Sequence, residues 1–297
     1  MLQAAAAAAG AQHYPVGALY VVATPIGNLA DLSLRAIHVL ATVDAVACED
    51  TRHSAPLLRH FGFDKPLIAL HQHNEQQAAA TVIGRLARGE RVAYVSDAGT
   101  PAISDPGAGL VAAAQAAGFI VVAIPGASSA VAALSVAGDT TGIGFTFIGF
   151  LGSKGGERSL AVKALAASAA TQVLFEAPHR IESLADALAA ACGARRVTIC
   201  RELTKQFETV MTLPAADLPA WLAADANRTR GEFVLVVHAQ PLAADAEEVA
   251  RHDFALSTLL RELPLKQAVA IAAELTGAPR NALYSRALAL KGQSAAS

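Results

Sequence analysis

The chain has 297 residues, 54% of them hydrophobic, and a formal net charge of −2. That length suffices for two α/β domains with a buried core, and the near-neutral charge argues against a protein coated with basic residues for naked nucleic acid. No apolar run reaches the roughly 18 uncharged residues of a membrane-spanning helix, so we expect no membrane segment. The three cysteines form no CxxC pair, so we expect neither a disulfide framework nor a metal site. We therefore expect the protein to be cytoplasmic.

Residues 1–16 are rich in alanine. They resemble a signal peptide only superficially, because no positive charge precedes the apolar stretch. We expect a disordered leader over 1–16.

An N-terminal α/β domain is predicted over residues 17–140. Short β-branched runs alternate there with segments of helical periodicity. The predicted strands cover 19–23, 44–49, 66–71, 91–96 and 119–124. Strands joined by crossover helices predict a parallel sheet with helices on both faces.

A second α/β domain is predicted over residues 141–240, because the glycines between Gly138 and Gly144 interrupt the alternation. Its predicted strands cover 145–150, 171–176, 196–201, 208–213 and 232–237. Two of these, within 196–213, follow one another without a helix, which predicts a mixed sheet.

The C-terminal part reads as an alanine-rich linker over 241–250 and a helical tail over 250–297. A turn with Gly277 and Pro279 between two helical segments is typical of a helix-turn-helix unit. From Arg251 onward the tail has six Lys or Arg and three Asp or Glu. This excess of basic residues fits either a tail that contacts nucleic acid or a tail that has only a packing role and exposes its charges to water.

Loops with glycine follow three predicted strands, at the sheet edge where open α/β sheets bind ligands. The first, Thr24 to Asn28, has one glycine where a dinucleotide site has three. Glu49 and Asp50 supply the acid that such a site also needs, but the glycine count favours a nucleoside ligand over a dinucleotide.

The second loop, Ser96 to Gly107, reads SDAGTPAISDPG. Its two glycines and two prolines give it a shape that can hold a ligand by backbone contacts. The third loop, Pro125 to Ala130, opens a helix with small residues, so the carboxylate of an amino-acid moiety could approach the helix N-terminus. A serine N-cap is the alternative interpretation.

Six motifs occur in order: VVATPIGNLADLSLRA, CEDTRHS, SDAGTPAISDPG, IPGASSAVAAL, LFEAPHRI and RELTKQFE. Together they resemble the tetrapyrrole methylase superfamily and, within it, the bacterial family of small-subunit rRNA methyltransferases I. The likeness runs from about residue 17 to 237, and the tail is similar to that family's helix-turn-helix extension.

The resemblance implies two α/β domains with S-adenosylmethionine in the cleft between them, and commonly a homodimer. It also implies methylation of the ribose 2'-hydroxyl of a cytidine in the decoding region of 16S rRNA, within the small ribosomal subunit. The cofactor-binding residues expected from the loops and the resemblance are Pro25, Ile26, Gly27, Asp97, Gly99, Thr100, Ile103, Gly126, Ala127, Ser128, Ser129, Ala130, Phe175 and Glu232. Many relatives have a proline where this chain has Ala127-Ser128-Ser129.

A ribose hydroxyl is a poor acid, so a carboxylate or imidazole within hydrogen-bond reach would assist its attack. The catalytic candidates are Glu49, Asp50, His73 and Glu75. Glu49 and Asp50 could instead pair with Arg52 or cap the next helix. No third ligand accompanies His71 and His73, so solvated histidines are favoured over a metal pair.

Contacts with RNA phosphate are expected from cations and a histidine in the motifs and from the glycine-rich segment 152–158. These residues are Arg52, Lys154, Arg158, His179, Arg180 and Lys205. We expect 152–158 to be a mobile loop that contacts RNA or only a flexible turn.

Three alternatives remain at this stage. One is a methylase of a corrin or porphyrin on the same fold. Another is a non-catalytic RNA-binding or ribosome-assembly protein that uses the tail as its module. A dinucleotide oxidoreductase is the third, and the single glycine of the first loop opposes it.

Overall fold

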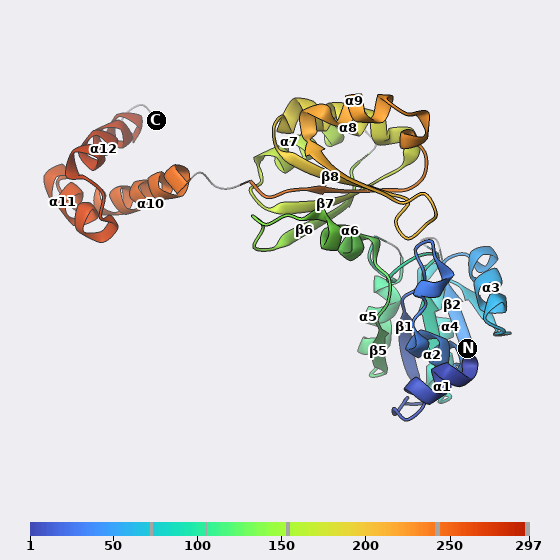
Figure 1. Cartoon of the computed structure of the whole chain (residues 1–297). Helices are drawn as coiled ribbons and strands as arrows, with labels where there is room; N and C mark the ends of the chain where they lie inside the picture. Colours follow the sequence, from blue (N-terminus) through green and yellow to red (C-terminus); the bar gives the residue numbers. More distant parts are fainter. Residues whose placement is uncertain (72–73, 105, 153–154, 241–243, 295–297) are drawn as a thin grey trace. The chain divides into compact units, whose positions relative to one another are not determined.

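The computed structural model describes residues 1–71, 74–104, 106–152, 155–240 and 244–294. The chain divides into two compact units, Met1–Ala239 and Gln240–Ser297 (Figure 1). The first unit contains two five-stranded sheets, and the second is helical. Within the described ranges no helix is long and apolar enough to cross a membrane.

The first sheet is entirely parallel, as predicted, with strand order β3-β2-β4-β1-β5. Its strands are β1 (Ala18–Val22), β2 (Ala45–Cys48), β3 (Leu67–Ala69), β4 (Val92–Val95) and β5 (Ile120–Ile124). Because the strands are parallel, their carboxyl ends and the loops that follow lie at one edge of the sheet.

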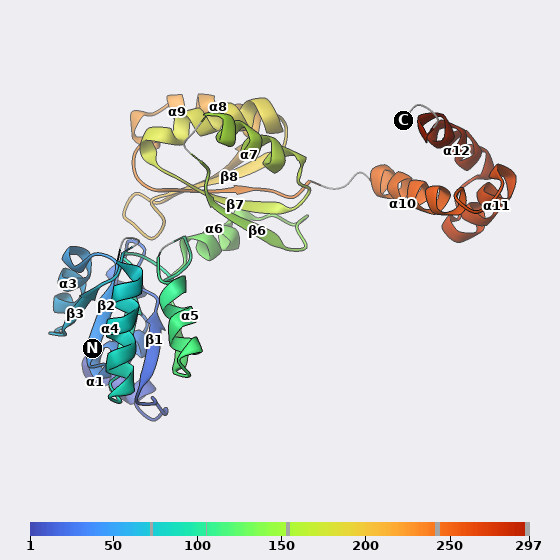
Figure 2. The same cartoon turned by 180° about the vertical axis from the view of Figure 1, so that it is seen from behind.

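Helices cover both faces of this sheet. On one face lie α1 (Leu2–Ala9), α2 (Leu34–Thr42) and α3 (Thr51–His60) (Figure 1); on the other lie α4 (Glu75–Ala87) and α5 (Ala108–Ala116) (Figure 2). Successive residues of β1 alternate between the two cores: Tyr20 packs with the α1–α3 side and Leu19 with the α4–α5 side.

The expected disordered leader is wrong for Leu2–Ala9, which form α1. Ala5 and Ala9 are buried, with 1% and 3% of their surface exposed, and α1 packs against α2. Alanine has the highest helix propensity, and its small side chain allows close packing on a neighbouring helix. The alanine run is therefore part of the first core.

The second sheet is mixed, as predicted, with order β6-β7-β10-β8-β9. Only β6 and β7 pair in parallel; the other pairs are antiparallel. The strands are β6 (Phe145–Phe150), β7 (Thr171–Glu176), β8 (Arg196–Arg201), β9 (Thr209–Pro214) and β10 (Phe233–Val237). One face carries α7 (Gly155–Ala167), α8 (Ile181–Cys192) and α9 (Leu218–Ala223), and the other carries α6 (Ser129–Ala137).

Helix α6 packs on the second sheet, so the chain passes from the first sheet to the second before this helix and not at residue 140. Ala130, Ala133 and Ala137 lie in one core cluster with Val173 of β7 and Val234 of β10. The glycines that suggested a boundary at residue 140 have another role: Gly138, with φ of 65°, ends α6 in the left-handed conformation. The expected glycine-rich loop over 152–158 is wrong from Gly155 on, where α7 begins.

A buried arginine ties together the end of the second sheet that lies opposite its ligand-side loops. Arg195 is 6% exposed. Its Nε donates to the His238 carbonyl at 2.6 Å, and Nη1 and Nη2 donate to the carbonyls of Leu165, Ser168 and Ala170 at 3.1, 2.8 and 2.9 Å. Burial lowers the pKa of this guanidinium. The side chain thus joins the end of α7, the residue before β7 and the residue after β10.

The second unit is a three-helix module with its own core. Its helices are α10 (Ala244–Leu259), α11 (Leu265–Thr276) and α12 (Arg280–Ser294). Leu256, Val269 and Leu283 contribute one buried residue from each helix. Gly277, with φ of 74°, ends α11, so α11 and α12 correspond to the predicted helix-turn-helix. The expected linker over 241–250 is wrong from Ala244 on, because α10 begins there.

Replacing Arg195 by methionine will lower the free energy of unfolding by at least about 3 kcal/mol, because the carbonyls of Ser168, Ala170 and His238 lose the guanidinium donor and each unsatisfied group costs about 1–3 kcal/mol. Urea denaturation measures this loss. Arg195→Lys, which keeps the charge and part of the bonding, will lose less. A methionine variant as stable as the parent would contradict the assigned role.

Candidate functional site

A cavity of about 380 Å³ in the first unit, called here the main cavity, lies where the three predicted loops meet. It is built from all three predicted loops together with the ends of strands in the second sheet. The residues that line it are Ile26, Ala98, Gly99, Thr100, Ile103, Ser104, Ser128, Ser129, Phe150, Phe175, Glu176, Ala177, Pro178, Leu203, Glu232, Phe233 and Val234. Its walls are mostly apolar, with a few polar groups, as is typical of small-molecule sites.

Backbone hydrogen bonds fix the three loops to one another. Thr24 and Gly99 form an isolated β-bridge in which each N–H donates to the other carbonyl, at 2.9 and 3.1 Å. The hydroxyl of Thr100 donates to the carbonyl of Ala127 at 3.0 Å. At Gly99, with φ of 81°, a Cβ would approach the Ile26 side chain to 3.2 Å. Loops one, two and three are therefore held as a single wall.

The far end of the second loop is held by side chains from β4 and α4. The Tyr94 hydroxyl donates to the Pro106 carbonyl. The Glu75 carboxylate accepts hydrogen bonds from the N–H groups of Gly107 and Gly109, at 3.2 and 3.1 Å. Glu75, a catalytic candidate by sequence, thus binds the N-terminus of α5, where a negative charge is favoured.

Backbone strain is concentrated in two segments beside the main cavity. Among the described residues, the non-glycine residues with positive φ are Ala102, Ser104, Glu202 and Thr204. The first two belong to the second loop, and the other two lie between β8 and β9. Such conformations cost about 1–3 kcal/mol each and persist only where the surroundings enforce them.

A buried carboxylate organises the end of β7. The Glu176 side chain is 0% exposed and lies 3.1 Å from both Arg158 Nη2 and Arg180 Nε. Arg180 also donates to the Leu151 carbonyl at 2.5 Å. The two guanidinium groups are only 14% and 21% exposed. Their geometry serves to neutralise Glu176 and to fix the cavity wall.

A second ion-pair group lies between β8 and β9. Lys205 Nζ is 2.9 Å from carboxylate oxygens of both Glu202 and Glu232. Burial lowers the pKa of Lys205 while its hydrogen bonds to the two carboxylates raise it, and the net shift is upward. A Cβ at Gly27 would come within 2.5 Å of Lys205 Cγ, so the lysine stem lies directly against the first loop. The group carries a net charge of about −1 beside the main cavity.

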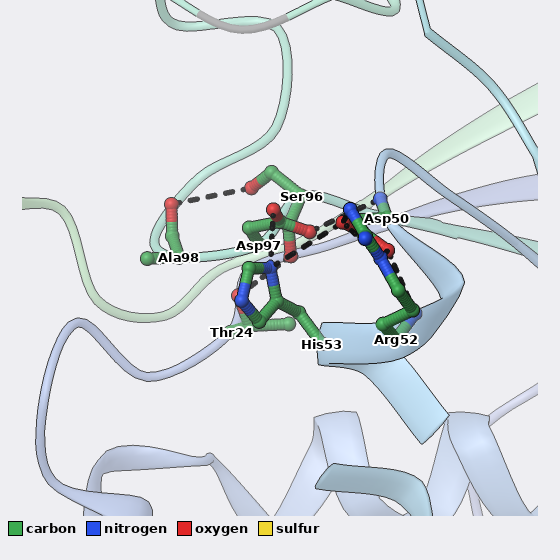
Figure 3. A network of polar contacts seen from close by, with 7 residues as sticks. All are labelled: Thr24, Asp50, Arg52, His53, Ser96, Asp97 and Ala98. Carbon is green, nitrogen blue, oxygen red and sulfur yellow. Dashed lines mark hydrogen bonds and ion pairs between the residues drawn. The ribbon is translucent and has the colours of Figure 1, made fainter. Parts of the chain in front are cut away.

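Another polar network lies at the carboxyl ends of β2 and β4 (Figure 3). His53 Nδ1 is 3.0 Å from Asp97 Oδ2, and Asp97 Oδ1 accepts a hydrogen bond from the Asp50 N–H at 3.2 Å. Asp50 caps α3 through the Arg52 N–H and pairs with the Arg52 guanidinium at 2.6 Å. Hydrogen bonds from the Arg52 side chain and N–H lower the pKa of Asp50 to about 2. Asp50 is therefore ionised at neutral pH and is a weak base.

This network borders a second cavity of about 470 Å³, called here the His53–Asp97 cavity. Its lining residues are Pro25, Gly27, Leu29, His53, Ser54, Pro56, Leu57, His60 and Asp97. The cavity shares its loops with the main cavity, because Ile26 and residues 98–100 face the main cavity while their neighbours face this one.

The structure divides the residues expected to bind the cofactor into three sets. Eight of them line the main cavity: Ile26, Gly99, Thr100, Ile103, Ser128, Ser129, Phe175 and Glu232. Pro25, Gly27 and Asp97 line the His53–Asp97 cavity instead. Gly126, Ala127 and Ala130 line neither, although the Ala127 carbonyl binds Thr100.

The remaining expected residues are scattered. Glu49 follows β2 beside Asp50, and His179 is exposed on the turn after β7. Arg52 is 87% exposed at the rim of the Asp50 network. His73 and Lys154 lie outside the described residues. Within the described part of the chain no group of three His, Cys, Asp or Glu is placed to hold a metal ion.

Sequence reasoning missed His53 and Glu176. A signal existed for His53: Asp50 precedes the predicted helix, and a residue three positions after an N-cap lies back against it. No local signal marks Glu176, because its two arginine partners come from α7 and the turn after β7.

Comparisons with known proteins agree with this architecture. The family model of Tetrapyrrole (Corrin/Porphyrin) Methylases matches residues 18–219, and that of the RsmI C-terminal HTH domain matches 243–291. Among solved structures, uroporphyrin-III-C-methyltransferase from Thermus thermophilus is 22% identical with a TM-score of 0.54, covering 75% of this chain and 94% of that one. Diphthine synthase is 16% identical with a TM-score of 0.55, covering 74% and 90%. These similarities show the fold.

Curated relatives match almost the whole chain. Ribosomal RNA small subunit methyltransferase I of Pseudomonas aeruginosa is 49% identical, covering 94% of this chain and 99% of the relative. The protein of that name from Escherichia coli O157:H7 is 46% identical, covering 93% and 96%. The fold, the loops and these relatives together show that the chain belongs to the tetrapyrrole methylases and, within them, to the ribosomal RNA small subunit methyltransferase I family.

Proposed function

We propose that this protein transfers a methyl group from S-adenosylmethionine to the ribose 2'-hydroxyl of a cytidine in 16S rRNA, in the decoding region of the small ribosomal subunit. The observation that carries the proposal is the main cavity, in which three sheet-edge loops and an aromatic pair enclose a nucleoside-sized space. Relatives named as small-subunit rRNA methyltransferases support the substrate class. Since such subunits lie in the bacterial cytoplasm, we expect the protein to act there.

The residues of the main cavity fit S-adenosylmethionine. Phe150 and Phe175 lie edge-to-face with ring centroids 5.6 Å apart and offer apolar contacts for an adenine ring. Ser128 at the N-cap of α6 makes no side-chain cap bond, so the first N–H groups of this helix are available to a carboxylate. The Lys205 group, with net charge of about −1, favours the cationic part of the cofactor. When bound, the cofactor supplies the methyl group.

The chain's own residues then position the acceptor. Holding a hydroxyl in line with its reaction partner supplies a large share of the acceleration of a transfer reaction. Asp50 is held ionised by Arg52, so it is better suited to orienting a hydroxyl than to removing its proton. Glu49 is the other carboxylate at the end of β2 and stays a candidate for the base.

Contacts with rRNA are proposed for exposed cations rather than for buried ones. Arg52 is 87% exposed although it pairs with Asp50, whereas the guanidinium groups of Arg158 and Arg180 are only 14% and 21% exposed and pair with Glu176. In the tail, Arg286 is 46% exposed and forms a bidentate pair with Asp253 at 2.6 Å, while Arg280 is 68% exposed at the start of α12 and lies 4.0 Å from Glu274. We therefore assign phosphate contacts to Arg52 and to the N-terminal end of α12.

We further propose that the protein forms a homodimer. Large apolar side chains are exposed on α6 and β6: Val131 is 59% exposed, Val136 49%, Phe145 52% and Ile148 39%. Exposed large apolar side chains can mark a protein–protein contact. A second copy of the chain would cover this surface.

The proposed reaction predicts the loss of one ribose methylation when the gene is deleted. Mapping of 2'-O-methylated nucleotides in 16S rRNA by mass spectrometry will show a cytidine of the decoding region unmethylated in the deletion strain. Restoring the gene will restore the methyl group. If every cytidine carries the same ribose methylation in both strains, the proposed function is wrong.

Replacing Thr100 by tryptophan will fill the main cavity and break the bond to Ala127. We expect the affinity for S-adenosylmethionine, measured by calorimetry, to fall at least about 100-fold, while circular dichroism shows an intact fold. Thr100→Ser keeps the hydroxyl and serves as the control. Unchanged affinity in the tryptophan variant would remove Thr100 from the cofactor site.

Deleting the second unit after Ala239 will weaken binding of small ribosomal subunits by at least about 10-fold and leave the affinity for S-adenosylmethionine within twofold. The reason is that the second unit has its own core and that its part from Arg251 on has six Lys or Arg against three Asp or Glu. Subunit binding is measured by filter retention and cofactor binding by calorimetry. Equal losses in both would show that the tail only supports the fold.

A further inference from the structure

We propose that the His53–Asp97 cavity binds a nucleobase of the rRNA substrate and selects one with an exocyclic amino group. This inference rests on the proposed function and deepens it, because it names the part of the substrate that the second cavity takes. It depends on three observations: the neighbouring position of the two cavities, the shape and chemistry of the lining, and the acceptor capacity left on Asp97.

The two cavities are lined by neighbouring residues of the same two loops. Along the first loop, Pro25 and Gly27 face the second cavity while Ile26 faces the main one. Along the second loop, Asp97 faces the second cavity and Ala98 faces the main one. The Thr24–Gly99 bridge joins these two loops. A nucleotide whose base enters the second cavity therefore keeps its ribose near the rim that leads to the main cavity.

The lining suits a flat ring rather than a phosphate. His53 and His60 contribute two imidazoles, and Pro25, Pro56 and Leu57 contribute apolar surfaces. Unpaired RNA bases stack on aromatic side chains of this kind, histidine included. Asp97 gives the lining of the cavity a negative charge. The neighbouring Asp50 adds nothing to this charge, because it is neutralised by Arg52. A phosphate would be repelled from the cavity, whereas Arg52 at its rim can meet the RNA backbone.

Asp97 supplies the base-reading group. An ionised carboxylate offers about four acceptor positions, of which Asp97 uses one on each oxygen, for the Asp50 N–H and for His53. Its side chain is 33% exposed, so the remaining positions are accessible. Because an ionised carboxylate only accepts, His53 Nδ1 carries the hydrogen, and this bond fixes the ring plane. Carboxylates accept hydrogen bonds from the amino group of cytosine, and uracil has no such group.

The test uses the full-length protein, S-adenosylmethionine and small ribosomal subunits from the deletion strain. Asp97→Asn places an amide in the cavity, with its NH₂ able to oppose the amino group. Leu29→Trp fills the cavity and leaves its polar side chains in place. Because Leu29 is 43% exposed, the larger side chain does not disturb the core. Asp64→Asn is the matched control, because Asp64 is exposed in the turn that precedes β3, at the opposite edge of the sheet.

We expect both cavity variants to raise the apparent KM for subunits at least about 10-fold, with S-adenosylmethionine affinity within twofold of the parent and the control unchanged. With subunits that carry uracil in place of the target cytosine, the parent will lose activity and Asp97→Asn will lose less. If both variants keep the parent's KM, or if cofactor affinity falls together with KM, the inference is overturned. A parent without activity on any small subunit would instead refute the proposed function.

Discussion

The pair of backbone hydrogen bonds between Thr24 and Gly99 is the constraint on which the site depends. It joins the loops that follow two adjacent strands, β1 and β4, and so fixes where each neighbouring side chain points. Ile26 and Thr100 turn into one cavity, and Pro25 and Asp97 into the other. Because the bridge uses main-chain atoms, it tolerates many side chains but requires the positive φ of Gly99.

Ion pairs surround both cavities. Each acidic group described beside the two cavities has a partner: Glu176 has two arginines, Glu202 and Glu232 share Lys205, Asp50 has Arg52 and Asp97 has His53. The ratios differ, however. The Glu176 group has an excess of one positive charge and the Lys205 group an excess of one negative charge, and each contributes a carboxylate, Glu176 or Glu232, to the lining of the main cavity. Since the Glu176 side chain is 0% exposed and its two arginines are 14% and 21% exposed, salt screens this group less than surface pairs.

Much of the fold follows from local sequence patterns. The β-branched runs predict all ten strands to within a residue or two, and the glycine and proline spacing identifies the three loops that build the main cavity. Local patterns do not predict the role of a residue when that role depends on partners distant in the sequence. Glu75 looks like a free acid in the sequence, yet it binds the start of α5. No local sequence pattern marks Arg195, although its side chain donates to four carbonyls. Similarly, nothing in residues 1–16 shows that α2 offers a surface for the alanine helix.

The four positive-φ residues beside the main cavity have a consequence for redesign of this protein. A peptide with the sequence of residues 96–107 would relax away from the left-handed conformations of Ala102 and Ser104, so the loop cannot be grafted onto another scaffold with its shape preserved. Glycine at either position would relieve strain locally and at the same time loosen the wall. Stability and binding are thus opposed at these positions, and improved thermal tolerance is better sought in the helices far from this edge of the sheet.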